Sequence, residues 1–213
     1  VSLLPQQVLP LHIFEPRSRQ MVEQVLDGSG QIAMAVFEGG DWKDTYHASP
    51  PIRPYVCVGQ IVQHERLPDG RYNLLLQGVC RARISRELPA DGERLYRAAM
   101  LVPTHDVPIE DDSLAERRDA LETMLSSDPL DRLTASAPIL EYIRNEDVPA
   151  TTVFELLGFA LLHDQDLRYR LLAEPDPTTR ASLIERELAN LQRLLRRADL
   201  QKPGEWPKGC SWN

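Results

Sequence analysis

Cysteine is scarce in this chain, with three among 213 residues. Cys57, Cys80 and Cys210 show none of the CxxC spacing that zinc sites and redox motifs use. This number and spacing predict no disulfide framework, and we expect Cys57 and Cys80 to be small buried groups in strands. Such cysteine usage best fits a reducing, cytoplasmic setting.

Lysine is equally scarce, and Lys43, Lys202 and Lys208 are the whole set. None of them ends a glycine-rich loop of the kind that holds nucleotide phosphates, so no ATP-driven motor is predicted within this sequence. Long apolar runs are missing as well, because none approaches the roughly 20 residues of a membrane-spanning helix. No charged and apolar leader opens the chain, and we expect a soluble protein without a membrane partner.

The histidines do not form a metal-binding pattern. They are scattered without HxH or HExxH spacing, at His12, His47, His64, His105 and His163. His12 lies near Glu15, but a structural hydrogen bond or simple exposure is favoured there over acid–base chemistry. The sequence therefore predicts no metal, no cofactor, no catalytic residue and no enzymatic activity.

Charge divides the chain into two parts. Residues 1–103 carry 11 basic and 11 acidic residues, whereas the remainder carries 13 basic and 21 acidic, so the whole net charge of −8 lies there. We expect a sheet-rich part over residues 1–108, a helical bundle over 109–200 and an irregular tail over 201–213. A sequence pI near 5.2 makes nucleic-acid binding unlikely, because phosphate backbones require a basic surface.

An apolar strand near the start runs directly into a helix. Apolar side chains alternate from Leu9 to Ile13, and Glu15-Pro16 then places a carboxylate and a fixed φ where a helix begins. Met21 and Val25 follow at helical spacing. Phe14, Phe37 and Tyr72 are expected in or near the core.

Further strands follow this corner. Residues 32–37 are continuously apolar, as in a strand covered on both faces. Residues 55–67 and 71–84 flank Pro68-Asp69-Gly70, which predicts a β-hairpin. Residues 94–102 indicate a further strand. The pattern is α+β, with a mainly antiparallel sheet before the helices.

Helical signals dominate from residue 113 onward. Ser113 and Glu116 have capping-box spacing and predict a helix that ends near Leu125. Shorter helical elements are expected after Pro129, Pro138 and Pro149, the last through Leu162. A long final helix is predicted over residues 179–198, with one apolar stripe.

Loop aromatics are the candidate binding residues. Trp42 and Tyr46 lie in a proline-rich segment, residues 41–54, and Tyr55 follows it. Exposed aromatic side chains bury much area at low entropic cost when a partner docks, so we predict a peptide-contact role. Alternatively, the loop folds back and covers the sheet with them.

Two arginines on one strand are a further candidate. Arg81 and Arg83 alternate, which places both on one face, where they could meet a phosphate or a carboxylate-rich partner. A solvated face is the favoured interpretation, because acidic residues elsewhere can pair with them.

Several segments together resemble the substrate-binding N-terminal domain of the Lon ATP-dependent proteases, a domain also found as a stand-alone protein. They are VLPLHIFEPR (8–17), VGQI (58–61), RLPDGRYNL (66–74), QGVCR (77–81) and, more weakly, FELLGFALL (154–162). The resemblance implies a PUA-like β-barrel followed by a helical bundle. It also implies an upstream apolar strand that would precede Val1.

The resemblance implies non-catalytic recognition of unfolded or exposed apolar polypeptide, with a separate ATP-dependent protease as a possible partner. No serine–lysine pair like the proteolytic one of the full-length enzymes occurs here. Two alternatives stay open: an adaptor that binds one folded protein, as in cereblon-type proteins, and a PUA-like RNA-binding protein, which the charge disfavours.

Overall fold

A computed structural model of the chain describes residues 2–39, 49–161 and 164–201, with the backbone alone at positions 111 and 112. The chain divides into two compact units. Unit 1 comprises Val1–Pro108 and His163–Asp176, and unit 2 comprises Ile109–Leu162 and Pro177–Asn213. No described helix is long and apolar enough to cross a membrane.

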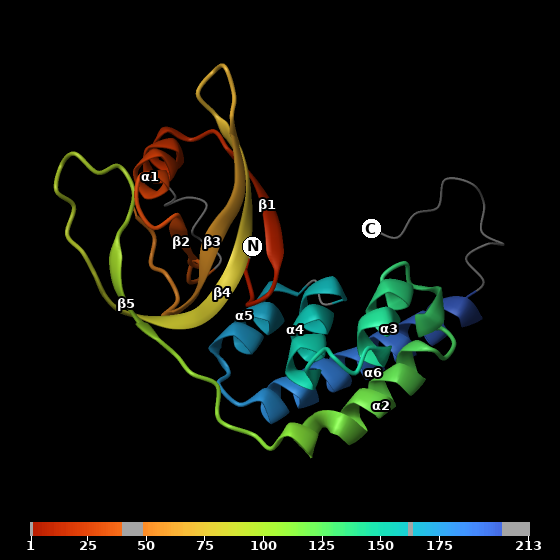
Figure 1. Cartoon of the computed structure of the whole chain (residues 1–213). Coiled ribbons are helices and arrows are strands. Elements are labelled where there is room, and N and C mark those ends of the chain that lie inside the picture. The colour runs from red at the N-terminus through yellow and green to blue at the C-terminus, as the bar shows by residue number, and fades with distance from the viewer. Residues whose placement is uncertain (1, 40–48, 162–163, 202–213) are drawn as a thin grey trace. The chain divides into compact units, whose positions relative to one another are not determined.

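Unit 1 combines a sheet with two helices (Figure 1). Its elements are β1 (Val8–Ile13), α1 (Pro16–Leu26), β2 (Gln31–Met34), β3 (Tyr55–Arg66), β4 (Tyr72–Glu87), β5 (Ala99–Pro103) and α5 (Gln165–Ala173).

Every strand of the sheet pairs antiparallel with its neighbours, in the order β1-β4-β3-β2. The long strand β4 has β3 along one side, while β1 and β5 share its other side, one at each end. This architecture confirms the predicted α+β class. In the described residues the ladders end at β2, so the pairing alone does not close the predicted barrel.

The predicted hairpin is confirmed as β3 and β4. Gly70 has φ of 80°, a conformation that glycine adopts without strain, and the amide of Leu67 donates to the carbonyl of Arg71 at 2.8 Å. An Asp69 carboxylate oxygen accepts from the Arg71 amide at 3.1 Å, which fixes the turn. Hydrogen bonds from Arg71, chiefly from its side chain, hold the pKa of Asp69 below its usual value.

The strand-to-helix corner is also confirmed. Glu15 occupies the N-cap with extended backbone dihedrals, and Pro16 opens α1, where its missing N–H costs nothing. Glu15 Oε2 accepts from Arg17 Nε at 2.8 Å. Phe14 departs from the prediction, because its side chain is 60% exposed and stacks on His12 with ring centroids 6.2 Å apart. Ile13, the last residue of β1, is in contrast only 9% exposed.

Two strand predictions need correction. Residues 32–37 are not covered on both faces, because Ile32 is buried whereas Ala33 and Ala35 are exposed, as expected of a strand at a sheet edge. Of the predicted strand 94–102, only residues 99–102 pair with β4, and β5 continues to Pro103. Residues 94–98 belong instead to a connecting loop, in which side chains accept from the amides of Arg94 and Leu95.

The helix α5 was missed by the sequence analysis. Asp164 caps it, since its carboxylate accepts from the Leu167 amide at 2.7 Å. Although residues 109–200 were expected to form one helical bundle, α5 groups with the sheet unit. Its Tyr169 hydroxyl accepts from the Tyr55 amide at 3.1 Å, and burial raises the pKa of Tyr169.

Unit 2 is helical, and its 3₁₀ turns are labelled η. Its elements are η3 (Asp111–Leu114), α2 (Ala115–Leu125), η4 (Leu130–Arg132), α3 (Ser136–Arg144), α4 (Ala150–Ala160) and α6 (Pro177–Leu200).

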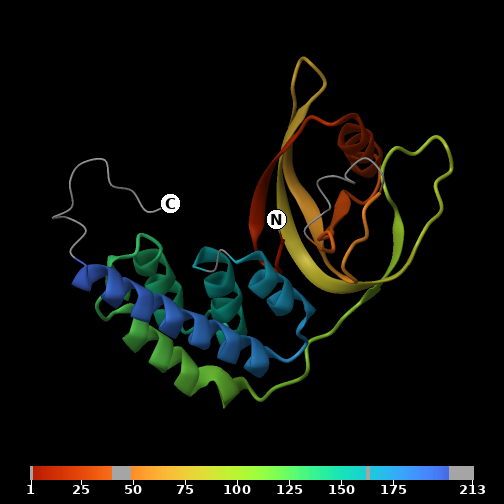
Figure 2. The same cartoon turned by 180° about the vertical axis from the view of Figure 1, so that it is seen from behind.

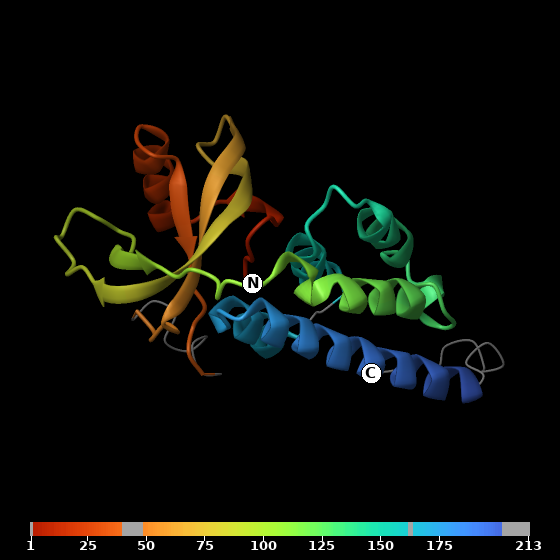
Figure 3. The same cartoon turned by 60° about the horizontal axis from the view of Figure 1, so that its bottom comes forward.

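Leucine side chains fill the interior of unit 2, including Leu121, Leu157 and Leu188, which are inaccessible to solvent. Helices α2 and α6 run side by side (Figure 3), and Arg117 Nη1 donates to Ser182 Oγ between them at 2.8 Å. The predicted capping box is wrong. A 3₁₀ turn precedes α2, so Leu114 takes the N-cap position and makes no side-chain capping bond.

Candidate functional site

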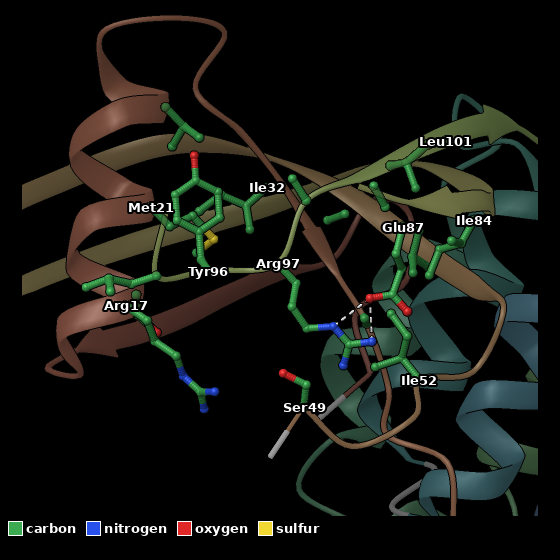
Figure 4. Close-up of a pocket in the computed structure, with 18 of the residues that line it drawn as sticks. Arg17, Met21, Ile32, Ser49, Ile52, Ile84, Glu87, Tyr96, Arg97 and Leu101 are labelled. Atoms are coloured by element: carbon green, nitrogen blue, oxygen red, sulfur yellow. Dashed lines mark hydrogen bonds and ion pairs between the residues drawn. The ribbon is translucent and has the colours of Figure 1, made fainter. Parts of the chain in front are cut away.

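A pocket of about 480 Å³ opens in unit 1 between α1, the sheet and the β4–β5 loop (Figure 4). Most of its wall is apolar. The main apolar side chains are Met21, Val25, Ile32, Val56, Ile84 and Leu101. Such a lining can bury apolar groups of a ligand, at roughly 25 cal/mol per Å² removed from water.

Helix and strand periodicities explain why these side chains converge. Met21 and Val25 are four residues apart on α1 and therefore lie on one face, and the adjacent Val22 is fully buried. Ile84 and Leu101 are cross-strand partners on β4 and β5. One helix face and one sheet face thus enclose the hollow.

An ion pair forms the polar part of the rim. Arg97 Nε and Nη2 lie 2.7 and 2.5 Å from Glu87 Oε2, and Figure 4 shows the two side chains pointing toward one another. Arg97 Nη1 also donates to the carbonyl of Pro50 at 2.6 Å. Arg17, which also lines the pocket, pairs with Glu15. The charges at the rim are therefore balanced.

The β4–β5 loop, residues 88–98, runs beside α1 (Figures 1 and 2). Side-chain amides of α1 hold it there. Gln20 accepts from the Leu95 amide at 2.7 Å and donates to the Glu93 carbonyl at 2.9 Å, as a neighbouring strand would. Gln24, one helical turn later, accepts from the Tyr96 hydroxyl at 2.5 Å. These contacts keep the loop over one side of the pocket.

Asp91 orders the far end of this loop. Its Oδ1 accepts from the amides of Arg94 at 2.8 Å and of Glu93 at 3.2 Å. These bonds, chiefly that from Arg94, lower the pKa of Asp91 from its usual value because they favour the ionised carboxylate. The loop is therefore held mainly by polar contacts.

None of the three proposed aromatic contact residues is seen in the pocket wall that the structure describes. Trp42 and Tyr46 fall in residues 40–48 and are outside the described residues. Tyr55 is half-buried and is not one of the side chains that line the pocket. Phe37 and Ser49, close to either end of residues 40–48, do line it.

Arg81 and His12 are both accounted for by structural contacts. Arg81 is only 6% exposed, which corrects the expected solvated face; Nη1 lies 3.7 Å from Asp106 and Nη2 donates to the Leu171 carbonyl at 3.5 Å. Helix α5 covers it, whereas Arg83 is exposed. His12 Nδ1 lies 2.7 Å from Asn73 Oδ1, so the structural interpretation holds. Across the described segments, no three His, Cys, Asp or Glu side chains gather as metal ligands would.

The sequence analysis missed Gln20, Gln24 and Arg97. The spacing of the two glutamines, i and i+4, places both on one helix face and was a usable signal. Nothing in the sequence, however, identified the loop that they hold, because the contact spans more than 70 residues. The pair of Arg97 with Glu87 depends on the β4–β5 register and was equally hidden.

The antiparallel sheet, the adjoining helix and the apolar pocket place unit 1 in a class of small α+β modules. Similarity to known proteins identifies the family. The family model of the ATP-dependent protease La (Lon) substrate-binding domain matches residues 1–190. The chain belongs to this family.

Similar proteins agree with this assignment. Lon proteases of Brucella abortus and Brucella suis are 28% identical over 116 residues, which is 54% of this chain and 14% of each relative. The chain thus matches only a small part of their length. The N-terminal domain of Mycobacterium avium complex Lon protease shares the fold, with a TM-score of 0.62, 21% identity and coverage of 88% of this chain and 92% of that one. A Lon N-terminal domain protein from Xanthomonas campestris shares the fold with a TM-score of 0.59 and 23% identity, and the comparison covers 88% of this chain and 92% of that one.

Proposed function

We propose that this chain recognises unfolded or exposed apolar polypeptide without catalysing a reaction, and that the pocket of unit 1 is the binding site. The observation that carries the proposal is the apolar, charge-balanced lining of this pocket in a member of a substrate-binding family. A separate ATP-dependent protease would be the natural recipient of such a client.

Binding would combine side-chain burial with ordering of the client. Full burial of one leucine or phenylalanine side chain contributes about 1.5–3 kcal/mol. Immobilising a flexible client opposes this gain, so we expect modest affinity and low sequence specificity. The finer architecture is part of the same proposal: unit 1 is a PUA-like barrel whose wall is incomplete at the pocket.

The test uses fluorescein-labelled casein as an unfolded client and follows its anisotropy as protein is added. Met21→Glu places a carboxylate in the apolar pocket, and we expect it to weaken binding at least about tenfold. Met100→Glu is the matched control, because Met100 lies on β5, is 50% exposed and does not line the pocket. Equal loss in both variants would refute the site, and no binding by the unaltered protein would refute the function.

Trp42, Tyr46 and Tyr55 remain proposed contact residues for the client. Phe37 and Ser49 line the pocket, and Trp42 and Tyr46 lie between them in the sequence, whereas Tyr55 follows them. Alanine variants of the three residues belong in the same titration, with Met100→Glu as the common reference.

A further inference from the structure

The pocket lies where two strands each have one edge without a partner strand. β2 pairs with β3 alone, and β5 pairs with β4 alone, among the residues that the structure describes. Residues of both strands line the same pocket, namely Ile32 and Ala33 from β2 and Ala99 and Leu101 from β5. We call the space between the unpaired edges of β2 and β5 the gap, and the apolar pocket lies in it.

The register shows which backbone groups of β2 face this gap. The Ile61 amide donates to the Gly30 carbonyl at 2.8 Å, so residues 30, 32 and 34 are the ones bonded toward β3. Further along, the Arg53 amide donates to the Val36 carbonyl at 2.8 Å. The alternation leaves the amide and carbonyl groups of Ala33 and Ala35 directed away from β3, and both residues are exposed.

The same reasoning applies to β5. The Thr104 amide donates to the Arg81 carbonyl at 3.0 Å, and the Leu88 amide donates to the Ala98 carbonyl at 2.8 Å. The bulge between these two points lies in β4, between Ile84 and Arg86, so the alternation along β5 is unbroken. The backbone groups of Ala99 and Leu101 consequently point away from β4, toward the gap.

Building on the proposed function, we propose that the client enters this gap as an extended strand and pairs with the edges of β2 and β5 that have no partner strand within the described part of the chain. Strand addition supplies main-chain hydrogen bonds that do not depend on client sequence, while alternate side chains enter the apolar pocket. Such a client segment has apolar residues at every second position and no proline. Because Glu87–Arg97 and Glu15–Arg17 are paired at the rim, an uncharged segment fits best.

The first measurement is amide hydrogen exchange of the full chain, alone and with an alternating valine–threonine peptide of about seven residues. We expect the amides of Ala33, Ala35, Ala99 and Leu101 to exchange at least about tenfold more slowly when the peptide is bound. A peptide of the same composition in blocked order, which lacks the alternation, is the control. Unchanged exchange at these amides with bound peptide would overturn strand addition.

The second measurement removes one edge donor. Ala33→Pro deletes an N–H that faces the gap without breaking the ladder to β3, and Ala33→Val keeps that N–H while also enlarging the side chain. We expect Ala33→Pro to weaken peptide binding about threefold to tenfold and Ala33→Val to change it less than about twofold. Equal binding by the two variants would count against the proposal, and the exchange experiment decides the matter if Ala33→Pro fails to fold.

The two proposals can fail separately. If neither casein nor the alternating peptide binds the unaltered protein, the proposed function itself is wrong. If casein binds, Met21→Glu weakens that binding, and the four edge amides stay unprotected, the pocket accepts side chains alone and only strand addition is wrong.

Discussion

The two units of this chain treat their backbone polar groups differently. In unit 2, charged side chains satisfy groups that the helices leave open: Arg118 donates to the carbonyls of Ile143 and Val148, both at 2.7 Å, and to that of Asn145 at 2.5 Å. In unit 1, the strands β2 and β5 keep amide and carbonyl groups directed into a pocket. Unit 2 thus satisfies these carbonyls internally, whereas unit 1 leaves one edge of β2 and of β5 without a partner strand among the described residues.

One ion pair from each unit shows a second contrast. Arg180 and Glu155 of unit 2 form an ion pair at 3.1 Å with side chains only 4% and 10% exposed. The pair at the pocket of unit 1, Arg97 and Glu87, is 33% and 42% exposed. Buried pairs are costly to break, while exposed pairs contribute little. The Arg180–Glu155 pair should therefore respond to charge removal far more strongly than the Arg97–Glu87 pair.

The largest effect is expected for Glu155→Leu. This change leaves the Arg180 guanidinium buried without its carboxylate, and we expect a loss of about 3–5 kcal/mol in the free energy of unfolding. Urea denaturation followed by far-UV circular dichroism measures it. The double variant Glu155→Leu/Arg180→Met is the control and should recover most of the loss, because it removes both charges. A loss below about 1 kcal/mol in the single variant would contradict the contrast between the units.

A smaller effect is expected for Arg118→Ala. The carbonyls at the end of α3 lose their cationic donor, and we expect destabilisation by about 2 kcal/mol in the same urea experiment. Arg144→Ala is the matched control, since Arg144 lies on α3 itself and pairs with Glu122 of α2, and these two side chains are 58% and 38% exposed. That control should cost less than about 1 kcal/mol. If the two variants are equally stable, the hydrogen bonds from Arg118 to these carbonyls contribute no more to the free energy of unfolding than an exposed ion pair does.

Local signals in the sequence predicted the elements well. The turn Pro68-Asp69-Gly70 and the corner at Glu15-Pro16 depend on neighbouring residues alone, and both are confirmed. The helix α5 carried a usable signal in Asp164, three residues before Leu167, yet its grouping with the sheet could not be read locally. Phe14 shows the limit of hydrophobicity as a guide, because which face of β1 is buried is set by partners about 60 residues away.

The candidate site was largely invisible in the sequence for the same reason. Its pocket requires the β4–β5 register, the packing of α1 on the sheet and the contact of Gln20 with Leu95. None of these leaves a pattern within a short window of residues. The family resemblance supplied the kind of function, whereas the place of binding emerged only from the three-dimensional arrangement.

The smallest expected effect concerns the β4–β5 loop and tests whether unit 1 is loosely held beside its pocket. Gln20→Ala removes the acceptor of the Leu95 amide and the donor to the Glu93 carbonyl, at a local cost of about 1 kcal/mol. We expect the Leu95 amide to exchange roughly fivefold faster, while amides of unit 2 keep their rates. Gln63→Ala, at an exposed position of β3 remote from this loop in sequence, is the control and should leave Leu95 unchanged. Faster exchange throughout both units would instead show that the loop opens only when the whole chain unfolds. Amide exchange would then give no difference between unit 1 and unit 2.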